Sequence, residues 1–260
     1  MGFLRNVKRT KKIAAAICIL VTLVLSYLLY ASEYHYALDD DDLSGAITEF
    51  ILPFHPSFEA YVLETESVGG TLIATYKDLT TADNYGVAEF KKGWNNKYRI
   101  VQTQSQVSEY SSVVQFYPLE IRNKRYYAVN GYNLPSEVGF YGPVYTDYSD
   151  YGVKDNQEIK APRFAVKNPQ FLDVYLEEDL DEQALGDIPE AAYRYMLSST
   201  SLYDTSGIDI TEKYKNATES TRVNSGAGKA ELLLLYIYIA VIMAFGILLT
   251  RYFLTEKVED

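Results

Sequence analysis

Two apolar stretches at opposite ends of the chain constrain its fold more than any other feature. Residues 13–30 and 232–249 carry no charge, and each would span roughly 27 Å as a helix, close to the ~30 Å hydrocarbon core of a bilayer. Tyrosine and phenylalanine stand at their ends, as they do at membrane–water interfaces. The pattern predicts two transmembrane helices, at residues 13–30 and 232–254, around a hydrophilic segment of about 200 residues.

Charges beside the first apolar stretch predict its orientation. Residues 1–12 contain no acid, and their cations are Arg5, Lys8, Arg9, Lys11 and Lys12. Cationic flanks remain in the cytoplasm. We therefore expect a cytoplasmic basic arm at 1–12, a cytoplasmic tail at 255–260, and residues 31–231 outside the cytoplasm. A cleaved signal peptide is the alternative, but its apolar core is usually only about 7–15 residues long.

Composition narrows the setting and the partners. The net charge of −11 already includes the basic arm, so the segment between the spans is more acidic than the whole chain. Such a segment disfavours binding to nucleic acid and to anionic lipid headgroups. Cys18, the only cysteine, lies in the first apolar stretch, which leaves the outer segment without a disulfide. An extracytoplasmic segment of this size without disulfides favours a bacterial cell envelope.

The outer segment reads as an α+β domain with a mainly antiparallel sheet and a few short helices. We expect strands at 71–77, 85–91, 97–104, 113–121 and 125–130, forming a five-stranded meander with one face covered by helices. The proposed boundaries are a stalk with a short helix at 31–56, the domain at 57–223 and a flexible tether at 224–231.

Helical spacing and further apolar runs refine these boundaries. Apolar residues recur at helical intervals over residues 43–52, and short helices are also expected at 58–63 and 188–198. A further strand is expected at 171–177. The aspartates at 39–42 would keep the stalk extended by mutual repulsion.

Residues 140–152 form the most unusual segment, which we interpret as a loop rich in tyrosine, aspartate, glycine and proline. Its candidate contact residues for a peptide, glycan or cation are Tyr141, Tyr145, Asp147, Tyr148, Asp150 and Tyr151. Exposed tyrosines offer rigid contact area and a hydroxyl group. The alternative is an aromatic loop that packs on its own sheet.

Other charged groups give weaker signals. The acidic runs at 39–42 and 177–182 could bind Ca²⁺, but the second lacks the ligand spacing of an EF-hand, so solvated acidic surfaces are favoured. Lys91, Lys92, Lys97 and Arg99 flank Trp94 and form either a local basic patch or solvated hairpin ends.

No motif assigns a catalytic residue, a metal ligand or a cofactor. His35 and His55 are the only histidines, and metalloprotease and serine-hydrolase motifs are absent from the sequence. A distant pair of carboxylates could still serve a cell-envelope hydrolase, which is the least favoured class.

Small residues at four-residue spacing within the apolar stretches suggest helix packing, either between the two spans or against a partner: Ala14, Cys18, Thr22 and Ser26 in the first, and Ala240 and Ala244 in the second. The expected cytoplasmic ends are too short to fold into an output domain. We therefore expect a non-enzymatic accessory, regulatory or assembly subunit of a membrane complex. The alternative is an extracytoplasmic ligand-binding or sensor module.

Overall fold

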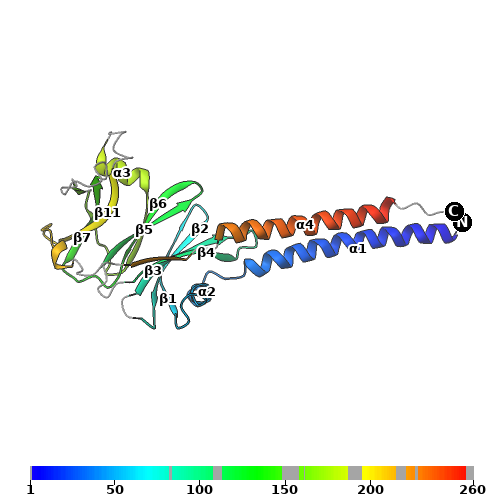
Figure 1. Ribbon diagram of the computed structural model, residues 1–260, viewed down its shortest axis with the longest axis horizontal. Coiled ribbons are helices and arrows are strands. Elements are labelled where there is room, and N and C mark those ends of the chain that lie inside the picture. Colours follow the sequence, from blue (N-terminus) through cyan, green and yellow to red (C-terminus); the bar gives the residue numbers. More distant parts are fainter. Residues whose placement is uncertain are drawn as a thin grey trace.

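Two long helices extend side by side from a β-rich domain, with both chain termini at the far end (Figure 1). The computed structural model describes residues 2–81, 84–107, 113–147, 158–160, 162–186, 195–214, 221–225 and 228–255. The helices are α1 (Gly2–Glu33) and α4 (Gly228–Thr255). Their segments Arg9–Glu33 and Glu231–Thr255 are each long and apolar enough to cross a membrane. Residues 2–12 of the basic arm are part of α1.

The first sheet lies next to the helices and is antiparallel throughout. Its order is β1 (Ala60–Val68), β2 (Thr71–Asp78), β3 (Asn84–Lys92), β4 (Tyr98–Val107) and β12 (Thr221–Ser225). Because Thr221–Ser225 pair with residues 103–107 of β4, this part of the chain belongs to the sheet. The expectation of a flexible tether at 224–231 is therefore wrong for the described residues, because β12 ends at Ser225 and α4 begins at Gly228.

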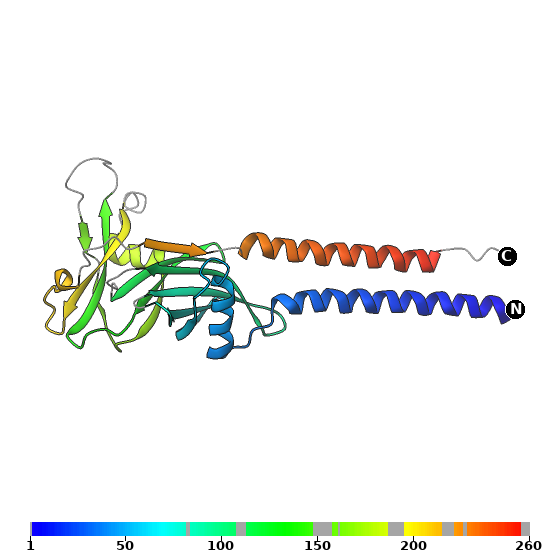
Figure 2. The same ribbon diagram turned by 60° about the horizontal axis from the view of Figure 1, so that its bottom comes forward.

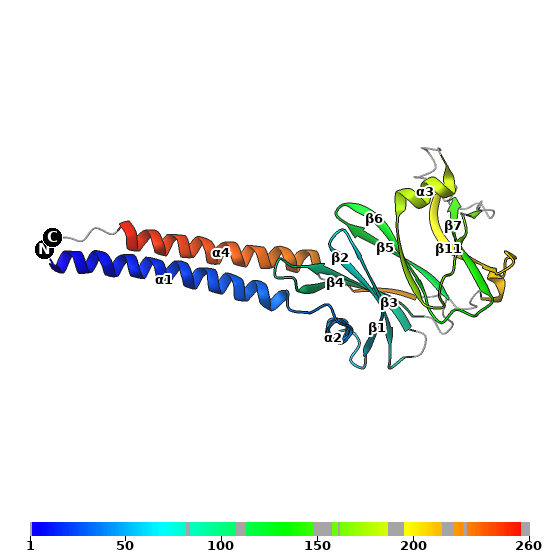
Figure 3. The same cartoon turned by 180° about the vertical axis from the view of Figure 1, so that it is seen from behind.

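Two further sheets lie farther from the helices (Figure 3). One has the order β10 (Phe171–Leu176), β6 (Lys124–Gly131) and β5 (Val114–Ile121). The other has the order β11 (Tyr195–Asp204), β7 (Val138–Asp147) and β8 (Glu158–Lys160), and β9 (Phe164–Ala165) also pairs with β7. A short 3₁₀ helix, η2 (Thr211–Lys213), follows β11.

The expected meander is therefore split between two sheets. All five expected strands form, but β5 and β6 leave the first sheet: they pair with each other, and β6 also pairs with β10. The physical reason is burial on both faces of the first sheet. Ile73 and Val87 point to a cluster with Tyr117, Leu119 and Ala128 of the second sheet, whereas the opposite face packs against a helix. The class α+β with mainly antiparallel sheets is confirmed.

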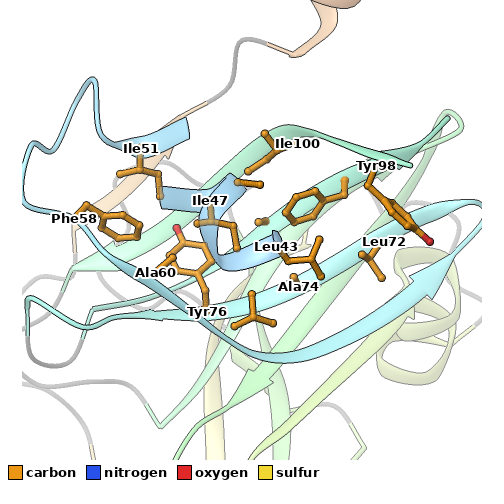
Figure 4. Close-up of a cluster of buried hydrophobic side chains, with 14 residues drawn as sticks. Leu43, Ile47, Ile51, Phe58, Ala60, Leu72, Ala74, Tyr76, Tyr98 and Ile100 are labelled. Carbon is orange, nitrogen blue, oxygen red and sulfur yellow. The ribbon is translucent and has the colours of Figure 1, made fainter. Parts of the chain in front are cut away.

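That helix is α2 (Asp40–Ile51), and it confirms the helix expected from the apolar spacing. Leu43, Ile47 and Ile51 pack onto the first sheet against side chains such as Tyr76 and Ile100 (Figure 4). Burial of this apolar stripe stabilises the helix far more than its intrinsic propensity does.

The acidic run before α2 begins the helix, and the expectation of an extended stalk is wrong. Asp39 is the N-cap and accepts a hydrogen bond from the Asp42 N–H at 2.8 Å. The aspartates at 40–42 occupy the first turn, where the helix dipole favours negative charge. Residues between α1 and α2 also pair with the sheet through the Tyr36–Tyr98 bridge.

Two other expected helices are also corrected. Residues 60–63 belong to β1, and Phe58 just before it is buried edge-on against the Tyr76 ring. Residues 195–198 of the expected helix at 188–198 belong to β11, because they pair with β7; residues 187–194 lie outside the described residues. The strand expected at 171–177 forms as β10, and α3 (Glu177–Leu185) follows it directly.

Candidate functional site

The tyrosine-rich segment begins as a strand at the centre of the third sheet. β7 pairs with β11 on one side and with β8 and β9 on the other. Tyr141 and Tyr145 are fully buried, so the expectation of an exposed loop is wrong for these two residues. Four residues apart on a strand, they point to the same face. Tyr148, Asp150, Tyr151 and the Asp147 side chain lie outside the described residues, and ligand binding there stays a prediction.

The buried hydroxyl groups meet carboxylates between the sheets, in what we call the tyrosine seam (Tyr127, Tyr141, Tyr145, Tyr175, Asp173, Glu177 and Asp181). Tyr141 donates a hydrogen bond to Asp173 Oδ2 at 2.9 Å, and the Tyr175 hydroxyl oxygen lies 2.8 Å from that of Tyr141. Phe164 and Phe171 stack against the Tyr141 ring. Burial raises the pKa of Tyr175 to about 12 and that of Tyr141 further.

The second half of the seam joins β6 and β7 to α3. Tyr127 donates a hydrogen bond to Glu177 Oε1 at 3.1 Å. Burial raises the pKa of Asp181 above its usual value, the nearby Tyr145 hydroxyl opposes that shift, and the Glu177 charge adds to it. The acidic run at 177–182 is thus partly inward-facing. Since neutral tyrosines supply the donors, the seam satisfies partly buried carboxylates and joins the sheets.

A second cluster, the junction of Arg99, Glu33 and Glu231, connects the domain to both long helices. Arg99 lies on β4, and its side chain is only 5% exposed. Its Nη2 lies 2.9 Å from Glu231 Oε2 in the first turn of α4, and its Nε lies 3.5 Å from Glu33 Oε2 at the end of α1. From the sequence alone, Arg99 is only one of several cations near Trp94, in a basic patch or at solvated hairpin ends. The signal that could have found it is a single acid at the domain end of each long apolar stretch.

Tyr30 of α1 and Tyr34, which directly follows α1, hold the β3–β4 hairpin beside this junction. The Trp94 N–H donates to the Tyr30 hydroxyl at 3.0 Å, and Asn95 Nδ2 donates to the Tyr34 carbonyl at 2.7 Å. The rings of Tyr30 and Tyr34 stack at 4.6 Å. A Cβ on Gly93 would lie 2.6 Å from the Tyr30 hydroxyl oxygen, so this close approach requires glycine.

The two long helices pack on each other through part of the expected small-residue pattern. Ala14, Cys18, Thr22 and Ser26 are all partly buried on α1. A Cβ on Gly246 of α4 would overlap the Thr22 side chain, which shows that the backbones approach closely there.

Ala240 and Ala244 differ, because both are exposed and point away from α1. The face of α4 that meets α1 instead contains Leu235, Ile239 and Gly246. The expectation that these alanines pack against α1 is therefore wrong, while their contact with a partner's helix stays a prediction.

Few other groups in the described ranges could carry chemistry. His35 and His55 are exposed. Within those ranges, no three side chains of histidine, cysteine, aspartate or glutamate gather as metal ligands would. No protein-family model matches the chain, and no curated protein or solved structure compared with it does either.

Proposed function

We propose that this chain is a two-span protein of a bacterial cell envelope that acts as a non-enzymatic accessory, regulatory or assembly subunit of a membrane complex. Both termini would lie in the cytoplasm, and the β domain would lie outside. The cationic arm before the first apolar stretch and the common end of the two termini support this topology.

The Arg99 junction is the observation that carries the proposal. One buried guanidinium group binds a carboxylate on each long helix, so the domain sets the relative position of the two helix ends. A displacement of the first sheet must move α1 and α4 or break these ion pairs. The junction thus gives a physical route by which binding or assembly outside could alter helix contacts inside the membrane.

The exposed face of α4 offers a surface that a partner helix can contact, so that a movement of α4 changes this contact. Ala240 and Ala244 are small, lie one helical turn apart and point away from α1. Small residues at this spacing let another helix approach closely in a lipid environment.

Site-specific photo-crosslinking in intact cells tests the proposal. A photoreactive residue at Ala244 should give a discrete crosslinked product, whereas one at Gly246, which faces α1, should give only intramolecular links. Arg99→Met should weaken the intermolecular product several-fold, and Arg125→Met, which changes an exposed arginine that pairs with Glu177 of α3, should not. A protein that yields no intermolecular product and purifies as a lone monomer in mild detergent contradicts the proposal.

A further inference from the structure

We propose that the tip of the β3–β4 hairpin, residues 92–97, is a binding site for phospholipid headgroups, formed by Trp94, Lys92 and Lys97. The inference rests on the proposed membrane location. It adds a third contact with the membrane, made by the β domain itself, to the two helices.

The depth of the tip follows from its aromatic neighbours. The Trp94 ring lies 5.6 Å from the ring of Tyr27 and 4.8 Å from that of Tyr30, measured between centroids. Tyr27 stands about 9 Å before the end of α1, within the apolar segment Arg9–Glu33. The hairpin reaches alongside the last turns of α1 (Figure 2). In a membrane that holds α1, Trp94 therefore lies at the interfacial layer.

The exposed Trp94 side chain is better suited to the interfacial layer of a membrane than to bulk water. Its side chain is 68% exposed although two tyrosines flank it, and it is the only tryptophan of the chain. Tryptophan favours the headgroup region, where its ring meets acyl carbons and its indole N–H meets polar groups.

Charge at the tip is complementary to phosphate. Lys92 and Lys97 are exposed on either side of Trp94, whereas the neighbouring Arg99 is paired with Glu33 and Glu231, so that this junction carries a net charge of −1. The acidic start of α2 lies farther from the long helices than the hairpin tip does (Figure 2). The domain's overall acidity disfavours anionic lipid, but charges beyond a Debye length of about 10 Å are largely screened, so the nearest charges govern the tip: two exposed lysines against the single net negative charge of the junction.

Hydrogen bonds between the hairpin and the end of α1 hold the tip in place before any lipid binds. Hydrogen bonds from Trp94 and Asn95 fix it to Tyr30 and Tyr34, and Gly93 permits that approach. A preorganised site loses little conformational entropy on binding.

Because Trp94 is the only tryptophan, fluorescence of the full-length protein in vesicles reports on this site alone. With phosphatidylcholine brominated at known acyl positions, we expect quenching that is stronger for bromines near the headgroup than for those near the chain end. A Trp94→Phe, Ile208→Trp variant is the control, because Ile208 is exposed on β11's far turn. Its emission should be unquenched. Equal lack of quenching in both proteins overturns the site.

The lysines are tested by comparing brominated phosphatidylglycerol with brominated phosphatidylcholine at equal mole fraction. We expect stronger quenching by the anionic lipid, and loss of that preference in Lys92→Gln, Lys97→Gln. Equal quenching in the unmodified protein overturns phosphate binding by the lysines. Flotation with the vesicles after alkaline washing separates the two proposals: a protein that floats with unquenched Trp94 refutes the hairpin site alone, whereas one that fails to float refutes the membrane location.

Discussion

Burial at the Arg99 junction is unequal between the partners. The Arg99 side chain is 5% exposed, whereas those of Glu33 and Glu231 are 42% and 54% exposed. Removing the arginine leaves two carboxylates that water can reach. Removing both carboxylate charges leaves a buried guanidinium group without its ionic partners, which is the costly case.

We therefore expect Glu33→Gln, Glu231→Gln to lower stability more than Arg99→Met, which keeps the apolar stem in place. The double change should cost about 1–3 kcal/mol, below the ~3–5 kcal/mol typical of fully buried pairs because the glutamates are half-exposed. Thermal unfolding of the full-length protein in detergent, followed by circular dichroism, measures both. A larger loss in Arg99→Met would contradict this view of the junction.

Asp78 provides a second test at the level of single residues. Its Oδ1 accepts hydrogen bonds from the Thr80 N–H at 2.9 Å and the Thr80 hydroxyl at 2.8 Å, and its Oδ2 accepts one from Asn84 Nδ2 at 3.2 Å. Burial would raise the pKa of Asp78, but the hydrogen bonds from Thr80, Thr81 and Glu59 outweigh it and lower the pKa below its usual value of 3.8.

Asp78→Asn places an NH₂ group opposite one of these donors and removes the charge, so we expect a loss of about 1–3 kcal/mol at pH 7. A lowered pKa means that the carboxylate stabilises the fold above its unfolded-state pKa and stops doing so as the pH falls through the folded-state pKa. The difference between the variant and the unmodified protein should therefore shrink below about pH 4. Asp40→Asn, an exposed change that removes only a favourable interaction with the dipole of α2, should cost less, about 0.3–1 kcal/mol.

At the scale of elements, the sequence predicts well what is local. Alternation and turn residues find β2 to β6, and the apolar stripe finds α2, because each signal repeats within a few residues. The helix expected at 188–198 is wrong for residues 195–198, because β11 is formed by pairing with β7, more than forty positions earlier in the chain. Membership of β12 in the first sheet is equally non-local, since its partner is β4.

For the candidate sites too, the sequence predicts local features and misses those that depend on distant parts of the chain. The sequence identifies Tyr141 and Tyr145 as unusual, but glycine and proline around them suggest a loop, and only the strands on both sides bury them. Arg99 appears in the sequence as one cation among several near Trp94. Its role depends on the meeting of β4 with two helices from opposite ends of the chain, which no local pattern encodes.

Antiparallel pairing of α1 and α4 makes a prediction about register. Thr22 lies opposite Gly246, so Cys18, one turn earlier, should lie opposite Thr250, one turn later. In a Thr250→Cys variant, mild oxidation should form an intramolecular disulfide with Cys18, detected as a mobility shift that reductant reverses. Leu248→Cys, on the exposed face, should not react in this way.

Gly246→Leu in the Thr250→Cys background should reduce the disulfide yield several-fold, because a large side chain must displace Thr22 and separate the helices. Ala244→Leu is the matched control, since Ala244 is exposed. An equal yield in both variants would show that the helices do not pack through Gly246.

At the scale of the whole molecule, the long helices separate the two termini from the β domain (Figure 1). If both helices cross one membrane, the turn after β11 and the end of α4 must lie on opposite sides of it. This follows from the fold whichever side is cytoplasmic. The cationic arm adds the prediction that the termini are on the cytoplasmic side.

Cysteine labelling in a Cys18→Ala background tests both statements with one reagent. Ser206→Cys, exposed in the turn after β11, should react with a membrane-impermeant maleimide in intact cells. Thr255→Cys, exposed at the end of α4, should react only after the membrane is permeabilised. The reverse pattern would keep the two spans but invert the orientation. Labelling of both sites in intact cells would mean that α1 and α4 do not cross the membrane together, and the proposed function would fall with that topology.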